Sequence, residues 1–202
     1  MEQEPQVIAL LGLGTIGLSF CALHLLHAHP SALVRAHDPR PDLPAHVRAN
    51  LPVYLRTLHH QQQQKRQQQA NATDGNDADS GEPPSVESLL RSGRLTLCPT
   101  LESACAGEGP DAVPATVIQE QGPESLAFKR ELWAAVAAHA SPDAHLWSST
   151  SGIFASLQTQ PSPSAPSASS AAAAGGTQEG GAAAAIASSS SRAAVAVYFW
   201  TF

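Results

Sequence analysis

The sequence predicts an α/β fold in which helices cover both faces of a parallel, doubly wound sheet. Short apolar runs alternate with segments whose apolar residues recur at helical spacing, from residue 7 to about residue 148. This alternation is typical of parallel strands joined by helices. In addition, a glycine-rich turn directly follows the first apolar run, as it does where a strand passes into a helix.

The first half of the chain contains four expected elements. A buried strand over 7–12 is followed by a helix over 15–27, because the apolar residues of the second segment lie three or four positions apart. A second strand over 32–38 leads through a proline-rich loop into an amphipathic helix that carries Val47, Leu51 and Leu55. Residues 61–84 are rich in glutamine and then in small polar residues, so we expect a disordered insertion there.

The second half repeats the alternation and then loses it. Strands are expected over 94–98, 115–118 and 145–150, with a helical turn over 101–106 and a helix that opens at Pro123 and Glu124. Residues 161–202 are dominated by proline, serine, alanine and glycine with few large apolar side chains. We therefore expect one folded domain over 6–160, interrupted by the insertion at 61–84, and a disordered low-complexity tail over 161–202.

Composition excludes several classes of protein. The net charge is −6 and no basic stripe is present, which argues against a nucleic-acid partner. No apolar run is long enough to span a bilayer, and the acidic N-terminus is unlike a signal peptide. The three widely spaced cysteines form no metal-binding or disulfide pattern. These observations favour a cytoplasmic protein with no metal site.

The segment from Gly12 to Gly17 matches the glycine pattern of a dinucleotide-binding turn. Gly12 turns the chain, Gly14 lets the backbone approach the pyrophosphate, and Gly17 lets the helix pack closely on the strand. Thr15 and Ile16 lie between the last two glycines, where the helix N-terminus presents free N–H groups to the anion. A glycine turn alone is weak evidence, so its context matters.

The context is supplied by Asp38 at the end of the second strand. It lies about 20 residues beyond the last glycine, where the carboxylate that binds the ribose hydroxyls is expected. A carboxylate there favours NAD over NADP because it repels a 2′-phosphate. The nearby Arg40 leaves that preference open. Together the turn and the acid predict a Rossmann-type fold that binds NAD.

Two further segments carry a resemblance to a known family. Residues 117–129 read Val-Ile-Gln-Glu-Gln-Gly-Pro-Glu-Ser-Leu-Ala-Phe-Lys, and residues 146–153 read Leu-Trp-Ser-Ser-Thr-Ser-Gly-Ile. With the glycine turn and Asp38 in the same order, they resemble the NAD-binding domain of the 3-hydroxyacyl-CoA dehydrogenase family. The motifs are most similar to the lambda-crystallin and carnitine dehydrogenase branch. The resemblance covers about residues 6–160 without the insertion.

The resemblance implies roles for three residues. Glu124 and Lys129 match positions that line the NAD site, and Ser151 matches a serine that contacts both the cofactor and the substrate hydroxyl. The resemblance also implies hydride transfer between NAD and a 3-hydroxyacyl-CoA or related hydroxy acid, in fatty acid metabolism. Other interpretations stay open: Glu124 as an acid that complements a helix dipole, Lys129 as a solvated side chain, and Ser151 as a turn residue.

The sequence also departs from the family. The family's next element carries a catalytic histidine, whereas here no histidine follows His145 and no asparagine follows Asn76. The family's C-terminal helical domain has no counterpart either. We therefore expect a truncated chain that is weakly active or inactive alone. A non-catalytic dinucleotide-binding module and an interaction protein are the alternatives, and the oligomeric state stays unassigned.

Overall fold

The computed structural model describes residues 6–70, 81–160 and 195–197. A six-stranded sheet forms its centre, in the order β3-β2-β1-β4-β5-β6, and every neighbouring pair of strands is parallel. The strands are β1 (Val7–Leu11), β2 (Leu33–His37), β3 (Leu95–Leu97), β4 (Val117–Glu120), β5 (His145–Ser148) and β6 (Val195–Val197). This strand order is the one found in dinucleotide-binding folds, which confirms the predicted Rossmann-type class.

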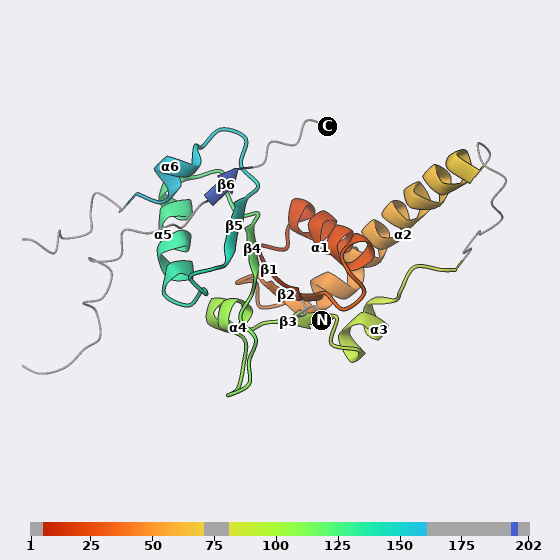
Figure 1. Cartoon of the computed structure of the whole chain (residues 1–202), viewed down its shortest axis with the longest axis horizontal. Coiled ribbons are helices and arrows are strands. Elements are labelled where there is room, and N and C mark those ends of the chain that lie inside the picture. The colour runs from red at the N-terminus through yellow and green to blue at the C-terminus, as the bar shows by residue number, and fades with distance from the viewer. Residues whose placement is uncertain (1–5, 71–80, 161–194, 198–202) are drawn as a thin grey trace, which may run out of the picture.

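Helices cover both faces of this sheet (Figure 1). They are α1 (Thr15–His27), α2 (Leu43–Ala70), α3 (Val86–Arg91), α4 (Leu101–Ala106), α5 (Leu126–Ala137) and α6 (Ala155–Gln158). One buried apolar cluster joins α1, α2 and α3 to the sheet, and a second cluster joins α4 and α5 to the opposite face. The molecule is therefore a three-layer α/β structure, as the alternating pattern predicts.

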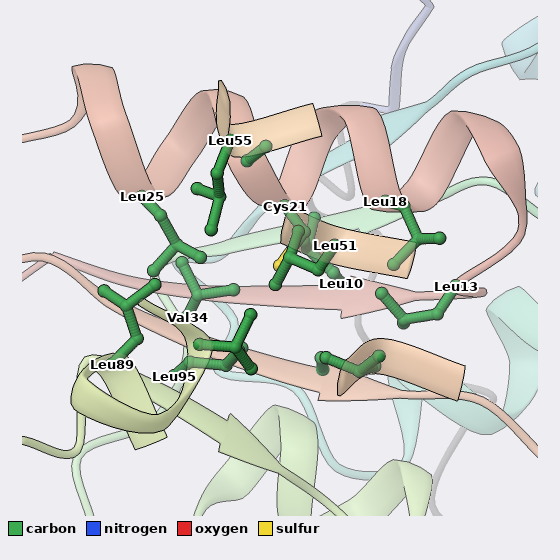
Figure 2. Close-up of a cluster of buried hydrophobic side chains, with 14 of the residues drawn as sticks. Leu10, Leu13, Leu18, Cys21, Leu25, Val34, Leu51, Leu55, Leu89 and Leu95 are labelled. Carbon is green, nitrogen blue, oxygen red and sulfur yellow. The ribbon is translucent and has the colours of Figure 1, made fainter. Parts of the chain in front are cut away.

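The central strand β1 divides its side chains between the two clusters. Ile8 and Leu10 belong to the α1 cluster, whereas Val7, Ala9 and Leu11 belong to the α5 cluster, and all five are at most 3% exposed. Burial on both faces explains why β1 is a continuous apolar run without polar alternation. Figure 2 shows Leu10 of β1 among the side chains that α1 and α2 contribute to the first cluster.

Helix α2 corrects the expected start of the insertion. The structure has a continuous helix from Leu43 to Ala70, so residues 61–70 are helical where the sequence predicted disorder. Glutamine, lysine and arginine are good helix formers, and an existing helix gains one hydrogen bond for each residue that it adds. Figure 1 shows the second half of α2 projecting away from the sheet. The rest of the insertion lies outside the described residues, apart from 81–84.

The tail contains a second correction. Residues 195–197 form β6, which pairs with β5 through Leu146↔Val195 and Ser148↔Val197, where a disordered tail was expected. Val195 and Val197 are β-branched, and the free edge of β5 offers them backbone partners. Residues 161–194 and 198–202 lie outside the described residues.

Other boundaries differ by one to three residues. Helix α5 begins at Leu126 with Ser125 as its N-cap, so Pro123 and Glu124 lie before the helix and do not open it. The Ser125 hydroxyl accepts a hydrogen bond from the N–H of Phe128, which is a standard N-cap arrangement. This shift leaves the Glu124 side chain free to contact another element. Among the described residues, no helix combines the length and the apolar character needed to cross a membrane.

Candidate functional site

The glycine turn lies at the carboxyl end of β1, between the ends of β2 and β4. Gly12 has a φ of +98°, a conformation that glycine adopts without strain. Its N–H donates to the carbonyl of His37 at 2.9 Å, and a Cβ there would lie 3.2 Å from the backbone of Gln121. The turn therefore lies beside the switch point between β1 and β4, where the order of the strands reverses. Open α/β sheets bind ligands at such a point.

The two remaining glycines differ in what surrounds them. A Cβ on Gly17 would lie 1.9 Å from the Gly12 carbonyl oxygen, so only glycine lets α1 close onto the turn. A Cβ on Gly14 would meet no protein atom within 4 Å, so the backbone of Gly14 faces open space. Gly14 is the N-cap of α1 and makes no side-chain cap, which leaves the first N–H groups of the helix available to an anion. This geometry fits a dinucleotide pyrophosphate.

Asp38 follows β2 directly and reaches the glycine turn. Its Oδ2 accepts a hydrogen bond from the N–H of Leu13 at 2.7 Å, so the acid and the turn are held in one arrangement. The opposite side of that segment is held by His46 of α2, whose Nε2 lies 2.9 Å from the Leu13 carbonyl oxygen. The turn is thus braced from β2 and from α2.

Arg40 donates hydrogen bonds to the second carboxylate oxygen of Asp38. Its N–H and its Nε donate to Oδ1 at 3.0 and 2.9 Å. Burial opposes the charged form of Asp38, but these bonds and the bond from Leu13 outweigh it and lower the pKa of the carboxyl. Asp38 is therefore ionised at neutral pH, as an acceptor for ribose hydroxyls must be.

Glu124 holds the loop that follows β5. Its Oε1 accepts a hydrogen bond from the Thr150 hydroxyl and one from the N–H of Gly152 at 3.0 Å. Burial raises the pKa of Glu124, but the bonds from Thr150, Gly152 and Ser151 and the charge of Lys129 together lower it. The side chain thus binds the loop that follows β5 and does not cap α5. This arrangement does not support its interpretation as an acid that complements the helix dipole.

Lys129 lies beneath this loop and is fully buried. Its Nζ donates to both carboxylate oxygens of Glu120, at 2.8 and 2.7 Å, and neither side chain is exposed. Glu120 also accepts from the Ser148 hydroxyl at 2.7 Å and from the N–H of Gly122 at 2.5 Å. The alternative of a solvated Lys129 is therefore wrong. A direct contact of Lys129 with the cofactor stays a prediction.

Ser151 is exposed on the loop that Glu124 holds. The far side of this loop is held by Gln158, whose Nε2 donates to the Ile153 carbonyl at 2.9 Å and whose Oε1 accepts from Trp133 Nε1 at 2.9 Å. All the residues expected at the site therefore follow the carboxyl ends of β1, β2, β4 and β5. The roles of Ser151 and Glu124 toward a ligand stay predictions.

Sequence reasoning missed the residues that support the site. Glu120, Ser148 and Thr150 are buried, and their bonds join β4, β5 and the loops that follow them. A glutamate that ends an apolar strand was the available signal for Glu120. The contact of His46 with the turn had no signal, because 33 residues separate His46 from Leu13.

The comparisons with known proteins agree with this geometry. Residues 104–161 match the family model described as 3-hydroxyacyl-CoA dehydrogenase, NAD binding domain. The matched segment includes Glu124, Lys129 and Ser151 but not the glycine turn or Asp38. No curated protein sequence matches the chain.

Several solved structures are similar to this chain. An NAD⁺-dependent 5-formyl-3-hydroxy-2-methylpyridine 4-carboxylic acid 5-dehydrogenase is 22% identical, with a TM-score of 0.50 over 74% of this chain and 38% of its own. FadB2 of M. tuberculosis is 19% identical, with a TM-score of 0.49 over 76% of this chain and 43% of its own. The 3-hydroxybutyryl-CoA dehydrogenase of Escherichia coli is 19% identical, with a TM-score of 0.49 over 76% of this chain and 26% of its own.

The fold and the site define a dinucleotide-binding α/β domain. The family model confirms the resemblance to the NAD-binding domain of 3-hydroxyacyl-CoA dehydrogenases over residues 104–161, and NAD is the cofactor of that domain. The chain spans less than half the length of the solved structures described above.

Proposed function

We propose that this chain forms the NAD-binding part of an oxidoreductase that acts on a 3-hydroxyacyl-CoA or a related hydroxy acid. The observation that carries the proposal is that two groups of site residues lie at the same edge of the sheet. Each group is called a half-site below. The glycine turn and Asp38 follow β1 and β2, and the loop of Ser151 follows β5. The family match over 104–161 supports the same substrate class.

Each half-site has a separate task in this proposal. The open backbone at Gly14 and the N-terminus of α1 bind the pyrophosphate, and Asp38 accepts hydrogen bonds from the adenosine ribose. The Ser151 hydroxyl binds the substrate hydroxyl and orients it. Glu124 holds the loop of Ser151 in position. When bound, NAD supplies the hydride acceptor.

A second candidate is a dinucleotide-binding module without catalysis. Oxidation of an alcohol by hydride transfer needs a general base to take the hydroxyl proton. No histidine follows Ser151 in this sequence, and His139 and His145 precede it on the scaffold side. This observation favours binding without efficient turnover by the 202-residue chain.

Calorimetric titration of the full chain with NADH tests the binding role. Asp38→Ala should weaken NADH binding by about tenfold or more, because a hydrogen bond to a charged group contributes roughly 1.5–3 kcal/mol. The matched control is Asp143→Ala, an exposed carboxylate in the turn before β5, which should change nothing. An unmodified chain that binds no NADH would contradict the proposal.

We also propose a cytoplasmic location. The support is chemical: Cys21, Cys98 and Cys105 are all unpaired and buried, as suits a reducing compartment. Burial raises the pKa of Cys21 to about 12, so this thiol stays protonated and acts as a small apolar side chain.

A further inference from the structure

The Asp38 carboxylate is almost fully engaged before any nucleotide binds. An ionised carboxylate offers about four acceptor positions. Three are taken here, by the N–H of Leu13 on Oδ2 and by the N–H and Nε of Arg40 on Oδ1. Bidentate binding of a ribose diol requires two positions, so it requires that Arg40 Nε leave the carboxylate.

The neighbouring prolines restrict the backbone of Arg40, and its side chain is partly exposed. Pro39 and Pro41 flank it, and a residue before proline is restricted to extended conformations. Its side chain is 30% exposed, whereas that of Asp38 is 10% exposed. Within the guanidinium, only Nε contacts Asp38, so the two terminal amino groups are not used by this ion pair.

We propose that Arg40 sets the nucleotide preference of this site, and that the site takes NADP(H) as a second ligand beside NAD(H). In the NADP(H) complex the guanidinium pairs with the 2′-phosphate, while Asp38 keeps its bond to Leu13. This inference rests on the proposed dinucleotide-binding function.

Charge and hydrogen bonding lead to this assignment together. An isolated carboxylate at this position repels a 2′-phosphate, but the ion pair with Arg40 cancels that charge at the ribose-binding edge. A guanidinium matches the geometry of phosphate oxygens and binds two of them at once. For NAD(H) the same side chain is a competitor, because it holds an acceptor position that the ribose needs. Arg40 therefore affects the two cofactors in opposite directions.

Replacing Arg40 by glutamine tests the assignment on the full chain. NADH and NADPH are titrated separately, with adenosine 2′,5′-bisphosphate and 5′-AMP as fragments that differ only at the 2′ position. In Arg40→Gln the affinity for NADPH should fall by about tenfold or more, because a charge-assisted phosphate contact is lost. The affinity for NADH should stay the same or rise by roughly two- to fivefold, as expected when a partly exposed ion pair no longer competes.

Arg48→Gln is the matched control. Arg48 donates through its Nε to Glu87 at 2.8 Å, and among the described residues this exposed pair makes no hydrogen bond with Asp38 or the glycine turn. Its loss should leave both affinities unchanged. Arg40→Lys keeps the charge without the fork of the guanidinium, so it should retain more NADPH affinity than the glutamine variant. Thermal unfolding of each variant shows whether it is folded.

Three results would overturn the assignment: equal weakening of NADH and NADPH in Arg40→Gln, an unchanged NADPH affinity, or no detectable binding of NADPH and adenosine 2′,5′-bisphosphate to the unmodified chain. If the unmodified chain binds NADH but not NADPH, only the role of Arg40 is wrong. If it binds neither cofactor, the proposed function itself fails.

Discussion

At the scale of single residues, Glu124 shows how one carboxylate can organise a loop without entering a helix. Bonds from Thr150, Ser151 and Gly152 and the charge of Lys129 overcome the cost of burial and lower its pKa below the ordinary value of 4.5. The ionised side chain is the stronger acceptor for these bonds. The bonds that hold the loop of Ser151 therefore weaken when Glu124 is protonated.

This dependence predicts a pH effect. Because the folded-state pKa is lowered, the stabilisation by Glu124 is present above pH 4.5 and is lost as the pH falls through the folded pKa. Glu124→Gln should reduce the melting temperature at neutral pH. The melting temperature of this variant should also fall less than that of the unmodified chain as the pH is lowered. Melting curves between about pH 3 and pH 7 measure this, with the exposed Glu131→Gln as control. An equal fall in melting temperature at low pH for Glu124→Gln and the unmodified chain would contradict the prediction.

The buried pair of Glu120 and Lys129 makes a second prediction. Removing one partner leaves the other charge uncompensated, so Lys129→Met should destabilise the fold by about 3–5 kcal/mol. The double variant Glu120→Gln/Lys129→Met should recover part of that loss, because no lone charge remains buried. Denaturant unfolding of four chains, namely the unmodified chain, Glu120→Gln, Lys129→Met and the double variant, gives the coupling between the two sites. Equal stability of the single variant and the unmodified chain would show that the pair is dispensable.

At the scale of elements, the junction of β1 and α1 separates folding from binding. Gly17 is in contact with the backbone of Gly12, whereas Gly14 faces open space. Gly17→Ala should therefore lower the melting temperature, since the helix must move away from the turn. Gly14→Ala should keep the melting temperature within a few degrees yet weaken NADH binding by roughly tenfold. Thermal melts and titrations on both variants distinguish these outcomes, and similar losses of stability in the two would refute the distinction.

At the scale of the whole molecule, the sheet divides the structure into two layers with different tasks. On one face, His46 of α2 holds the segment of the glycine turn at Leu13, while on the other face Trp133 of α5 and Gln158 of α6 hold the loop of Ser151. Both layers pack on β1 and β4, so the two half-sites share one rigid support. In the sequence, no histidine follows Ser151 that could act as a base.

The chain should accordingly bind NADH and turn over slowly. Absence of a general base typically costs about 10²–10⁴-fold in rate. NADH formation from 3-hydroxyacyl-CoA and small hydroxy acids, followed by absorbance between about pH 6 and pH 10, measures this prediction. Robust turnover that is abolished by changing His139 or His145 would mean that the base precedes Ser151.

The sequence by itself determined the elements whose signals are local. The spacing of apolar residues predicted α1 over Thr15–His27, and a helical turn was expected over Leu101–Ala106 where α4 lies; the structure has both with these bounds. The glycine spacing predicted the turn between β1 and α1, because Gly12 has a positive φ and a Cβ on Gly17 would collide with the backbone of Gly12. The role of Asp38 toward a ribose stays a prediction. Helix α2 extends to Ala70, beyond the predicted limit at residue 61, because a glutamine-rich run that lacks apolar periodicity can still continue an existing helix.

Only the tertiary structure decided the contacts between distant segments. Glu120 and Lys129 became a buried pair because β4 and α5 share one apolar cluster. His46 reached the turn because α2 packs against α1. Strand β6 needs the edge of β5, since three residues cannot form a strand alone. Burial, charge pairing and strand pairing all depend on what surrounds a residue in space, and local sequence carries little of that information.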